Sequence, residues 1–450
     1  MAVSKGHEVI PSARRLIMSL RDMGYDFAQA IADVVDNSVE AGASRVNIDV
    51  EFDGDASWVR IADNGIGMSP DQLREAMRYG AEREYEDDDL GKFGLGLKTA
   101  SMSQCQCLSV ASRRNTDRAN IAAYSWDLEH IKSTNRWEIL PVDDGNQVPG
   151  IREPLKDSTG TVVLWQRLDR ILGYKHPYGE AARRQLAQMC REIEQHVAMV
   201  FHVFLAGQAP RRKRLRIFVN GNEVKPWDPF CESEQKARKL QPIRFEVEHE
   251  GVHGDVLLQP YILPHQNDFS SPEAFGRASG PNNWNQQQGF YIYRGNRMIQ
   301  SGGWSGLRVP DEHTKLARVA VSFSPVLDEA FKINVAKMKV QLPTKIRDAI
   351  KEAIVPVTKL AREVYDGKNR ERTQAILQKH AKEKASSEPT ISGTGNLKSD
   401  QQSELVVDAK GNSDLLSINQ WAERMLALAT NQERPVVKAV LVRLGGDHLD

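Results

Sequence analysis

One segment, residues 26–41, limits what this chain can fold into more than any other, because its side chains are sorted by type at helical spacing. One side carries Ile31, Val34, Val35 and Ser38. The other side carries, at positions i, i+3, i+4 and i+7, the residues Asp33, Asp36, Asn37 and Glu40. A helix of this kind packs one face on a core. Its other face is either solvated or a set of oxygen ligands for Mg²⁺, with a carboxylate that can accept a proton.

The residues around this helix predict a sheet. Period-two alternation marks strands at 45–52 and 58–62, and further strands are expected at 107–112, 120–126 and 161–167. Between them, Ser69, Pro70 and Gln72 form an N-cap, a first-turn proline and a capping-box partner, which start a helix that ends at residue 78. Because strands and helices do not alternate as regular βαβ units, we expect an α/β sandwich rather than a doubly wound sheet.

The rest of the chain divides into three more parts. Residues 176–208 predict a long helix, 180–204, which connects the first region, 1–175, to a second α/β region at 209–366. There we expect strands at 215–220, 243–248, 255–263, 289–293 and 319–323, and helices at 327–331 and 344–365. Residues 367–450 predict a charged helix (370–384), a flexible linker (385–413) and a short amphipathic helix (415–428).

Composition and charge exclude several classes of protein. The 60 Lys and Arg residues balance 60 Asp and Glu residues, so no net charge draws the whole molecule to nucleic acid or to an anionic membrane. The chain shows no run of about 18 apolar residues and no N-terminal signal sequence, which predicts a soluble cytoplasmic protein. The four cysteines, which lack metal-ligand spacing and fit a reducing compartment, are Cys105, Cys107, Cys190 and Cys231.

Two glycine-containing segments follow the helix at 26–41. Asp63-Asn64-Gly65-Ile66-Gly67-Met68 ends a predicted strand, and it is either an ordinary turn or a loop whose Asp accepts a hydrogen bond from an amine. Gly91–Ser101 offers backbone N–H groups of the kind that cradle phosphates. The spacing is not that of a Walker A loop, and the glycines do not follow a strand as a dinucleotide-binding fingerprint requires.

In order and spacing, the three segments resemble the GHKL ATPase superfamily of gyrase, the heat-shock chaperones, histidine kinases and MutL, and within it MORC-like and MutL-like bacterial proteins. The resemblance implies a GHKL α/β sandwich followed by a transducer-type α/β domain, with ATP and Mg²⁺ as ligands. Asp63 would accept the adenine amine, Thr161 would support it, and Asn37 would ligate Mg²⁺. The adenine loop would add Gly65, Gly67 and Met68, and the phosphate lid would add Lys92, Gly94, Leu95, Gly96, Leu97 and Lys98.

The same resemblance assigns two catalytic residues. The general base of the family is usually Glu, and Asp33, one methylene shorter, takes its place here. Misplacement by about 1 Å can cost on the order of a hundredfold in rate, so we expect slow ATP hydrolysis that depends on Asp33. Ile333–Val340 resembles the MutL transducer segment whose lysine reaches the nucleotide, and Lys337 falls at that position. Gly289–Ile299 is similar to a strand-turn-strand of MORC-like relatives.

The resemblance implies an ATP-gated switch that forms a homodimer and acts on DNA, in a restriction or anti-phage system with a nuclease, helicase or methylase as partner. The basic run 211–216 either meets DNA or is a solvated loop. An ATP-binding scaffold with little hydrolysis, or a chaperone-like protein, is the alternative. A histidine kinase is disfavoured because the helix begins near residue 26, and a MutL mismatch-repair protein because the tail shows no metal-binding endonuclease motif.

Overall fold

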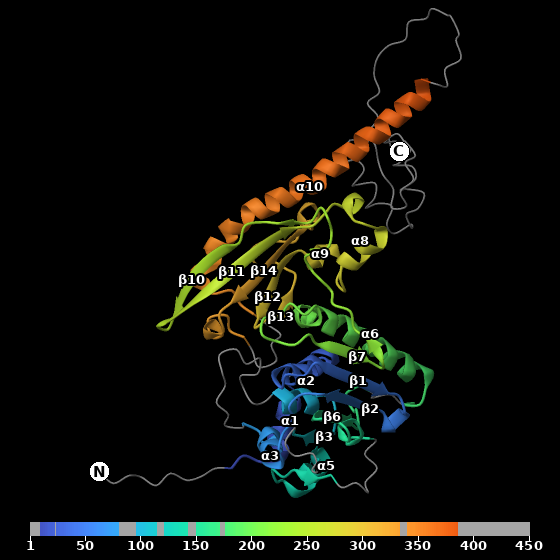
Figure 1. Ribbon diagram of the computed structural model, residues 1–450, viewed down its shortest axis with the longest axis vertical. Coiled ribbons are helices and arrows are strands. Elements are labelled where there is room, and N and C mark those ends of the chain that lie inside the picture. Colours follow the sequence, from blue (N-terminus) through green and yellow to red (C-terminus); the bar gives the residue numbers. More distant parts are fainter. Residues whose placement is uncertain are drawn as a thin grey trace, which may run out of the picture. The chain divides into compact units, whose positions relative to one another are not determined.

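The computed structural model describes residues 10–22, 24–80, 96–114, 121–142, 150–171, 176–333 and 340–385, with side chains as far as residue 367. The chain divides into two compact units, Met1–Ile376 and Leu377–Asp450. Both sheets belong to the first unit (Figure 1). The linker and terminal helix predicted after residue 385 lie outside the described residues. No helix in the described ranges is long and apolar enough to cross a membrane.

The first sheet has eight strands in the order β5-β4-β3-β6-β2-β1-β7-β8. Their bounds are β1 (Arg45–Glu51), β2 (Trp58–Asp63), β3 (Cys107–Arg113), β4 (Ala122–Asp127), β5 (Leu140–Pro141), β6 (Gly160–Gln166), β7 (Arg216–Val219) and β8 (Asn222–Glu223). The strand expected at 215–220 in the second region belongs here instead, because β7 pairs in parallel with β1. The first sheet therefore continues past residue 208, where the sequence placed the start of the second region.

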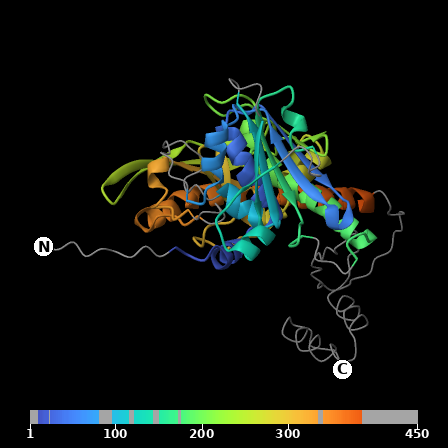
Figure 2. The ribbon, with the colours of Figure 1, turned by 90° about the horizontal axis from the view of Figure 1, so that it is seen from below.

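Helices cover one face of this sheet and a short loop segment covers the other. The helices are α1 (Ala13–Arg21), α2 (Phe27–Glu40), α3 (Pro70–Met77), α4 (Gly96–Met102), α5 (Leu128–Thr134), α6 (Glu180–Val200) and α7 (His202–Leu205). Apolar side chains of α2 and of the strands share one large core. A smaller core on the opposite face includes Ile151 and Leu155. The predicted α/β sandwich is confirmed, and Figure 2 shows the helical layer beside the strands.

Local sequence signals position α2 and α3. The Asp26 side chain caps α2 by accepting a hydrogen bond from the Gln29 N–H at 2.8 Å. At α3 the predicted capping box is present, since Ser69 and Gln72 bond each other's backbone N–H groups. These caps satisfy backbone groups that a helix end leaves without partners.

The second sheet has the strand order β10-β11-β14-β12-β13, with β9 paired to β11. Its strands are β9 (Arg238–Lys239), β10 (Ile243–His249), β11 (Val252–Ile262), β12 (Gly289–Arg294), β13 (Arg297–Ser301) and β14 (Ala317–Phe323), and its helices are α8 (Pro272–Ala278), α9 (Trp284–Gln287) and α10 (Thr344–Ala385). The 3₁₀ helices of the described chain are η1 (Gly54–Ala56), η2 (Glu153–Leu155), η3 (Gln266–Asp268), η4 (Glu312–Thr314) and η5 (Pro325–Leu327). The helix predicted at 327–331 is wrong: η5 ends there, and Lys332 takes a positive φ.

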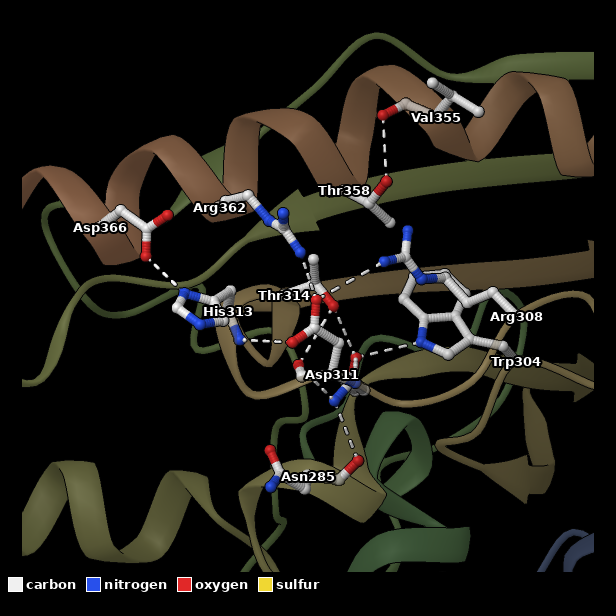
Figure 3. Close-up of polar contacts among 11 residues, drawn as sticks. Asn285, Trp304, Arg308, Asp311, His313, Thr314, Val355, Thr358, Arg362 and Asp366 are labelled. Atoms are coloured by element: carbon white, nitrogen blue, oxygen red, sulfur yellow. Dashed lines mark hydrogen bonds and ion pairs between the residues drawn. The ribbon is translucent and has the colours of Figure 1, made fainter. Parts of the chain in front are cut away.

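The helix predicted at 344–365 and its charged continuation form one long helix, α10, which packs on the second sheet (Figure 1). Its buried apolar face holds it there, and two partly exposed ion pairs lie beside this contact: Arg362 pairs with Asp311, and His313 Nδ1 lies 2.6 Å from Asp366 Oδ1 (Figure 3). We call Asp311, His313, Arg362 and Asp366 the α10 junction. Beneath it, the buried Gln288 amide oxygen accepts hydrogen bonds from the Trp304 indole and the Thr314 hydroxyl.

Candidate functional site

The carboxylate of Asp63 lies at the end of β2, where three donors fix its oxygens. Oδ1 accepts from the backbone N–H of Gly65 at 2.8 Å and of Thr161 at 3.2 Å. Oδ2 accepts from the Ser38 hydroxyl of α2 at 3.1 Å. Burial raises the pKa of Asp63, and these three bonds oppose the rise. Since a carboxylate offers about four acceptor positions, the described contacts leave one on Oδ2 for the amine of a ligand.

Two glycines let the chain close around this carboxylate. Gly67 and Gly160 have φ angles of +64° and +140°. A Cβ on Gly67 would lie 1.9 Å from the Arg113 carbonyl oxygen, and one on Gly160 would lie 1.9 Å from that of Asp63. Only residues without a side chain fit such approaches. The turn predicted at residues 63–68 is therefore present, and its second glycine packs against protein backbone.

A serine in β3 connects the loop after β2 to β6. The Ser112 hydroxyl accepts from the Met68 N–H at 2.8 Å and donates to the Gly160 carbonyl at 2.9 Å. It also lies 3.0 Å from the Thr161 hydroxyl. Met68 and Thr161, which are far apart in the sequence, thus lie around one hydroxyl group, beside Asp63. Ser38 and Ser112 were not among the predicted site residues, because an isolated serine in a strand or helix carries no spacing signal.

The second acid, Asp33, lies in the middle of α2 and is buried. Its Oδ2 accepts from the Tyr25 hydroxyl at 2.9 Å, and its Oδ1 lies 3.3 Å from Arg297 Nη2. Burial, and after it the Asp33 charge, raises the pKa of Tyr25 far above its usual value, so Tyr25 remains a donor. A Cβ on Gly96 would lie 3.8 Å from Asp33 Oδ2. The first residue of α4 therefore approaches the carboxylate.

The two polar residues that follow Asp33 on α2, Asp36 and Asn37, differ in exposure and in partners. Asn37 is exposed, and its Nδ2 donates to the Asp33 carbonyl at 3.1 Å, so its carbonyl oxygen is the atom left to serve a cation. Asp36 is buried and pairs with Arg297 instead. In the part of the chain that is described, no group of three or more His, Cys, Asp or Glu could hold a metal ion. One protein oxygen fits Mg²⁺, which keeps several waters and takes phosphate oxygens.

Lys98 does not point into open space. It is buried in α4, its ammonium donates to the Ala76 carbonyl of α3 at 3.0 Å, and it lies 6.0 Å from the centre of the Tyr79 ring. Burial lowers the pKa of Lys98 to about 8, and Glu75 opposes the shift. Leu97, next to it, is half-buried against the first core. The structure thus places Lys98 where it holds the end of α3.

Arg297, in β13, is a further residue of this site to which the sequence assigned no role. Its Nε lies 2.7 Å from Asp36 Oδ1, and the three side chains Asp33, Asp36 and Arg297 form what we call the α2 junction. The arginine and Asp33 are 264 positions apart. The only sequence signal was the predicted strand-turn-strand at 289–299, which marked the segment and gave its arginine no role.

Four predicted site residues lie outside the described residues, namely Lys92, Gly94, Leu95 and Lys337. The ten that are described group around the two acids. Gly65, Gly67, Met68 and Thr161 lie at Asp63, whereas Asn37, Gly96, Leu97 and Lys98 lie on α2 or α4 near Asp33. Helices α2 and α4 contact each other, so the residues on them lie in one region.

Comparison with known proteins gives a family for this region. Residues 25–161 match the family model described as histidine kinase-, DNA gyrase B-, and HSP90-like ATPase. The matched range begins at the tyrosine that donates to Asp33 and ends at the threonine whose N–H binds Asp63.

Individual relatives extend the match beyond that range. The chain is 35% identical over 260 residues to the DNA mismatch repair protein MutL of Pasteurella multocida. This match covers 54% of this chain and 37% of that protein. The chain is 36% identical over 267 residues to MutL of Mannheimia succiniciproducens, 56% of this chain and 38% of that protein. It is 29% identical over 159 residues to Protein MICRORCHIDIA 4 of Arabidopsis thaliana, 30% of this chain and 19% of that protein. The chain therefore spans well under half the length of these relatives.

Proposed function

We propose that residues 25–161 form a GHKL ATPase domain in a chain of the MORC- and MutL-like kind, and that the protein is an ATP-operated switch that pairs with a second copy when nucleotide is bound. The observation that carries the proposal is the arrangement of Asp63 and Asp33. Asp63 ends strand β2 and Asp33 lies in helix α2, which packs on the same sheet, and neighbouring donors fix the oxygens of each.

In this proposal the end of the site at Asp63 binds adenine. The position left on Asp63 Oδ2 accepts the exocyclic amine of the base, and the Thr161 N–H keeps Oδ1 in place. Gly65, Gly67 and Met68 form the wall of the loop, held by Ser112. A buried carboxylate with a raised pKa gains from such a donor, because a hydrogen bond to the charged form favours that form.

The end of the site at Asp33 carries the hydrolysis. Asp33 acts as general base for the attacking water, and Asn37 ligates Mg²⁺ through its carbonyl oxygen. Bound Mg²⁺ would neutralise phosphate charge and orient the phosphates. Asp33 is shorter than the usual Glu and both its oxygens have donors, so we propose slow turnover. Lys92, Gly94, Leu95 and the transducer lysine at 337 stay predictions of the family resemblance.

The phosphate lid contributes through the start of α4. Gly96 already lies near Asp33, so its backbone is placed to approach a phosphate beside the base. Lys98 would have to leave the Ala76 carbonyl to reach a phosphate itself. Because its pKa is about 8, Lys98 is about half protonated at pH 8. A phosphate nearby would favour its charged form.

A role on DNA is the finer part of the proposal, and its support is that the MutL relatives are DNA mismatch repair proteins. The basic run predicted to meet DNA is only partly available for it. Arg212 donates to the Val39 carbonyl, Arg214 to the Leu205 carbonyl, and Arg216 pairs with Glu223. Each member of the run except Arg212 is nevertheless exposed, Arg211 and Lys213 among them. A role in restriction or anti-phage defence stays a prediction, on which none of the described side chains bears.

Binding and hydrolysis of ATP by matched variants test the proposal. Asp63→Asn should reduce ATP affinity strongly, whereas Asp33→Asn should bind ATP and lose turnover, because each acid serves one end of the nucleotide. Asp49→Asn, which removes an acid of β1 paired with Arg60, is the control and should change neither. If Asp63→Asn binds ATP as the unchanged protein does, the assignment of the adenine end is wrong. Turnover unchanged in Asp33→Asn would contradict its role as base.

Dimerisation and DNA dependence need a separate measurement. Light scattering with and without a non-hydrolysable ATP analogue should show a dimer only with the analogue, and DNA at low salt should promote it. No effect of DNA at low salt would remove the DNA-directed part. Single-turnover hydrolysis distinguishes the ATPase from the alternative, an ATP-binding scaffold, which would bind nucleotide and release no phosphate.

A further inference from the structure

The β12–β13 hairpin presents two arginines side by side. Arg294 and Arg297 are opposite each other in the register, and the two residues between them, Gly295 and Asn296, both have positive φ. A two-residue turn of this type matches the twist of a hairpin. Opposite residues of an antiparallel pair project from the same face, so like charges there repel unless each is neutralised.

Each arginine is neutralised by a different part of the molecule. Arg294 forms a forked ion pair with Asp328, with Nε to Oδ1 and Nη2 to Oδ2 both at 2.8 Å. Asp328 follows η5, directly after β14 of the second sheet. Arg297 instead reaches α2, where its Nε lies 2.7 Å from Asp36 and its Nη2 lies 3.3 Å from Asp33. The hairpin therefore binds the second sheet to the helix of the candidate base.

The contacts of Arg297 also fix its own position. The shorter of its two ion pairs is with Asp36, and its guanidinium carbon lies 5.9 Å from the centre of the Phe201 ring. Burial, and after it the Arg297 charge, lowers the pKa of His196 to about 4, so this neighbour on α6 is neutral at pH 7. A fork held on one side by Asp36 leaves its second N–H group in a fixed place for Asp33.

A general base must be oriented toward the water that it activates, and two donors orient the carboxylate of Asp33. Tyr25 holds Oδ2 of Asp33 and Arg297 faces Oδ1, from elements on either side of α2 in the sequence. Tyr25 belongs to the same region as Asp33. Arg297 comes from the second sheet, so the orientation of the carboxylate depends on where that sheet holds its hairpin.

We propose that Arg297 is a positioning residue for the Asp33 carboxylate, and that the Arg294–Asp328 pair sets the hairpin that delivers it. This role, which rests on the proposed function of Asp33 as base, makes hydrolysis depend on the second sheet while nucleotide binding depends on Asp63. In the described part of the chain, Arg297 contacts Asp36 and Asp33 and none of the residues around Asp63. Its loss therefore separates turnover from affinity.

The test compares three variants of the full chain in ATP affinity and in kcat. Arg297→Lys keeps the charge and loses the fork, and we expect kcat to fall roughly 10- to 100-fold with ATP affinity within about twofold, as for a displaced base. The double variant Arg297→Met, Asp36→Asn removes the main ion pair as a unit and should show at least the same loss. Arg318→Met is the matched control, because Arg318 is buried in the same sheet but donates to the Pro229 and Ala278 carbonyls.

Each result decides the matter. Arg318→Met should lose stability and keep its kcat, which excludes general destabilisation as the cause of the loss in the Arg297 variants. A folded Arg297→Lys with unchanged kcat overturns the positioning role, and so does a loss of affinity equal to the loss of kcat. Failure of the proposed function is seen separately, since the unchanged protein would then release no phosphate, whether or not it binds ATP.

Discussion

Two charged junctions connect the second sheet to helices, and they differ mainly in exposure. At the α2 junction the side chains of Arg297 and Asp33 are 5% and 3% exposed. At the α10 junction those of Arg362 and Asp311 are 52% and 29% exposed. Both junctions place an arginine against a carboxylate. The first takes its charges out of water, and the second leaves them largely in it.

This difference predicts different functions for similar contacts. Breaking a buried pair leaves an uncompensated charge and costs roughly 3–5 kcal/mol, whereas an exposed pair contributes about 0.2–1 kcal/mol. The α2 junction therefore has one arrangement of its three side chains that is strongly preferred. The α10 junction can rearrange at little cost. We infer that the ion pairs fix the geometry at the candidate base, whereas those at α10 add little to a helix that the second core holds in place.

The largest effect is expected for Arg297→Met. This change leaves Asp33 and Asp36 buried without their arginine, so the free energy of unfolding should fall by roughly 3–5 kcal/mol. Urea denaturation followed by circular dichroism measures the loss. Adding Asp36→Asn should restore at least half of it, since one of the two buried negative charges is then removed, and with it the repulsion between the acids. If the double variant is no more stable than the single one, repulsion between the acids is not the cause.

A second buried pair, Arg294–Asp328, should respond nearly as strongly. Asp328→Asn keeps the size of the side chain and one acceptor, so we expect a loss near the lower end of roughly 3–5 kcal/mol. The same variant should lower kcat less than Arg297→Lys does, because it displaces the hairpin and leaves Arg297 in place. Urea denaturation and the steady-state rate of ATP hydrolysis check the two parts. A kcat lower than that of Arg297→Lys would reverse this order.

Of the two ends of the candidate site, the sequence predicted the one at Asp63 well. Asp63, its glycines and the α3 capping box depend on short spacings, and local turn and helix chemistry determines where such residues lie. The sandwich followed from strand and helix patterns and from the family resemblance. These features needed no knowledge of tertiary contacts.

The α2 junction could not be predicted in the same way. The pattern at 26–41 suggested that Asp33 and Asp36 lie together on a polar face, yet both are buried and pair with one arginine from a distant hairpin. No spacing rule relates residues so far apart. Membership of β7 in the first sheet was missed for a similar reason, since a parallel pairing with β1 depends on how α6 returns the chain.

A smaller, pH-dependent effect is expected at His202, also buried between the two regions. The Tyr293 hydroxyl lies 2.8 Å from His202 Nε2, and burial lowers the pKa of His202 from 6.5 to about 4. The unfolded chain then binds a proton between pH 6.5 and about 4 that the folded chain does not. Stability from this group is present above pH 6.5 and is lost as the pH falls toward 4, by at most roughly 3 kcal/mol.

Melting temperature against pH checks this sign. His202→Asn should flatten the fall in melting temperature between pH 6.5 and 4, whereas His253→Asn, on the exposed β10–β11 hairpin, should leave the curve as it is. The contrary result, an equally steep fall in His202→Asn, would assign the acid sensitivity to other groups.

The smallest effect is expected at the α10 junction. Arg362→Gln removes the partner of Asp311, and His313→Gln removes that of Asp366, but each pair is largely exposed. We expect each change to cost about 0.2–1 kcal/mol, and the cost to shrink in 1 M salt, where the Debye length is about 3 Å. Loss at the α2 junction should not shrink, because salt screens buried pairs much less. Urea denaturation at two salt concentrations thus separates the junctions, and a cost at Arg362 that is large and independent of salt would show that its pair with Asp311 behaves like the buried pair at the candidate base.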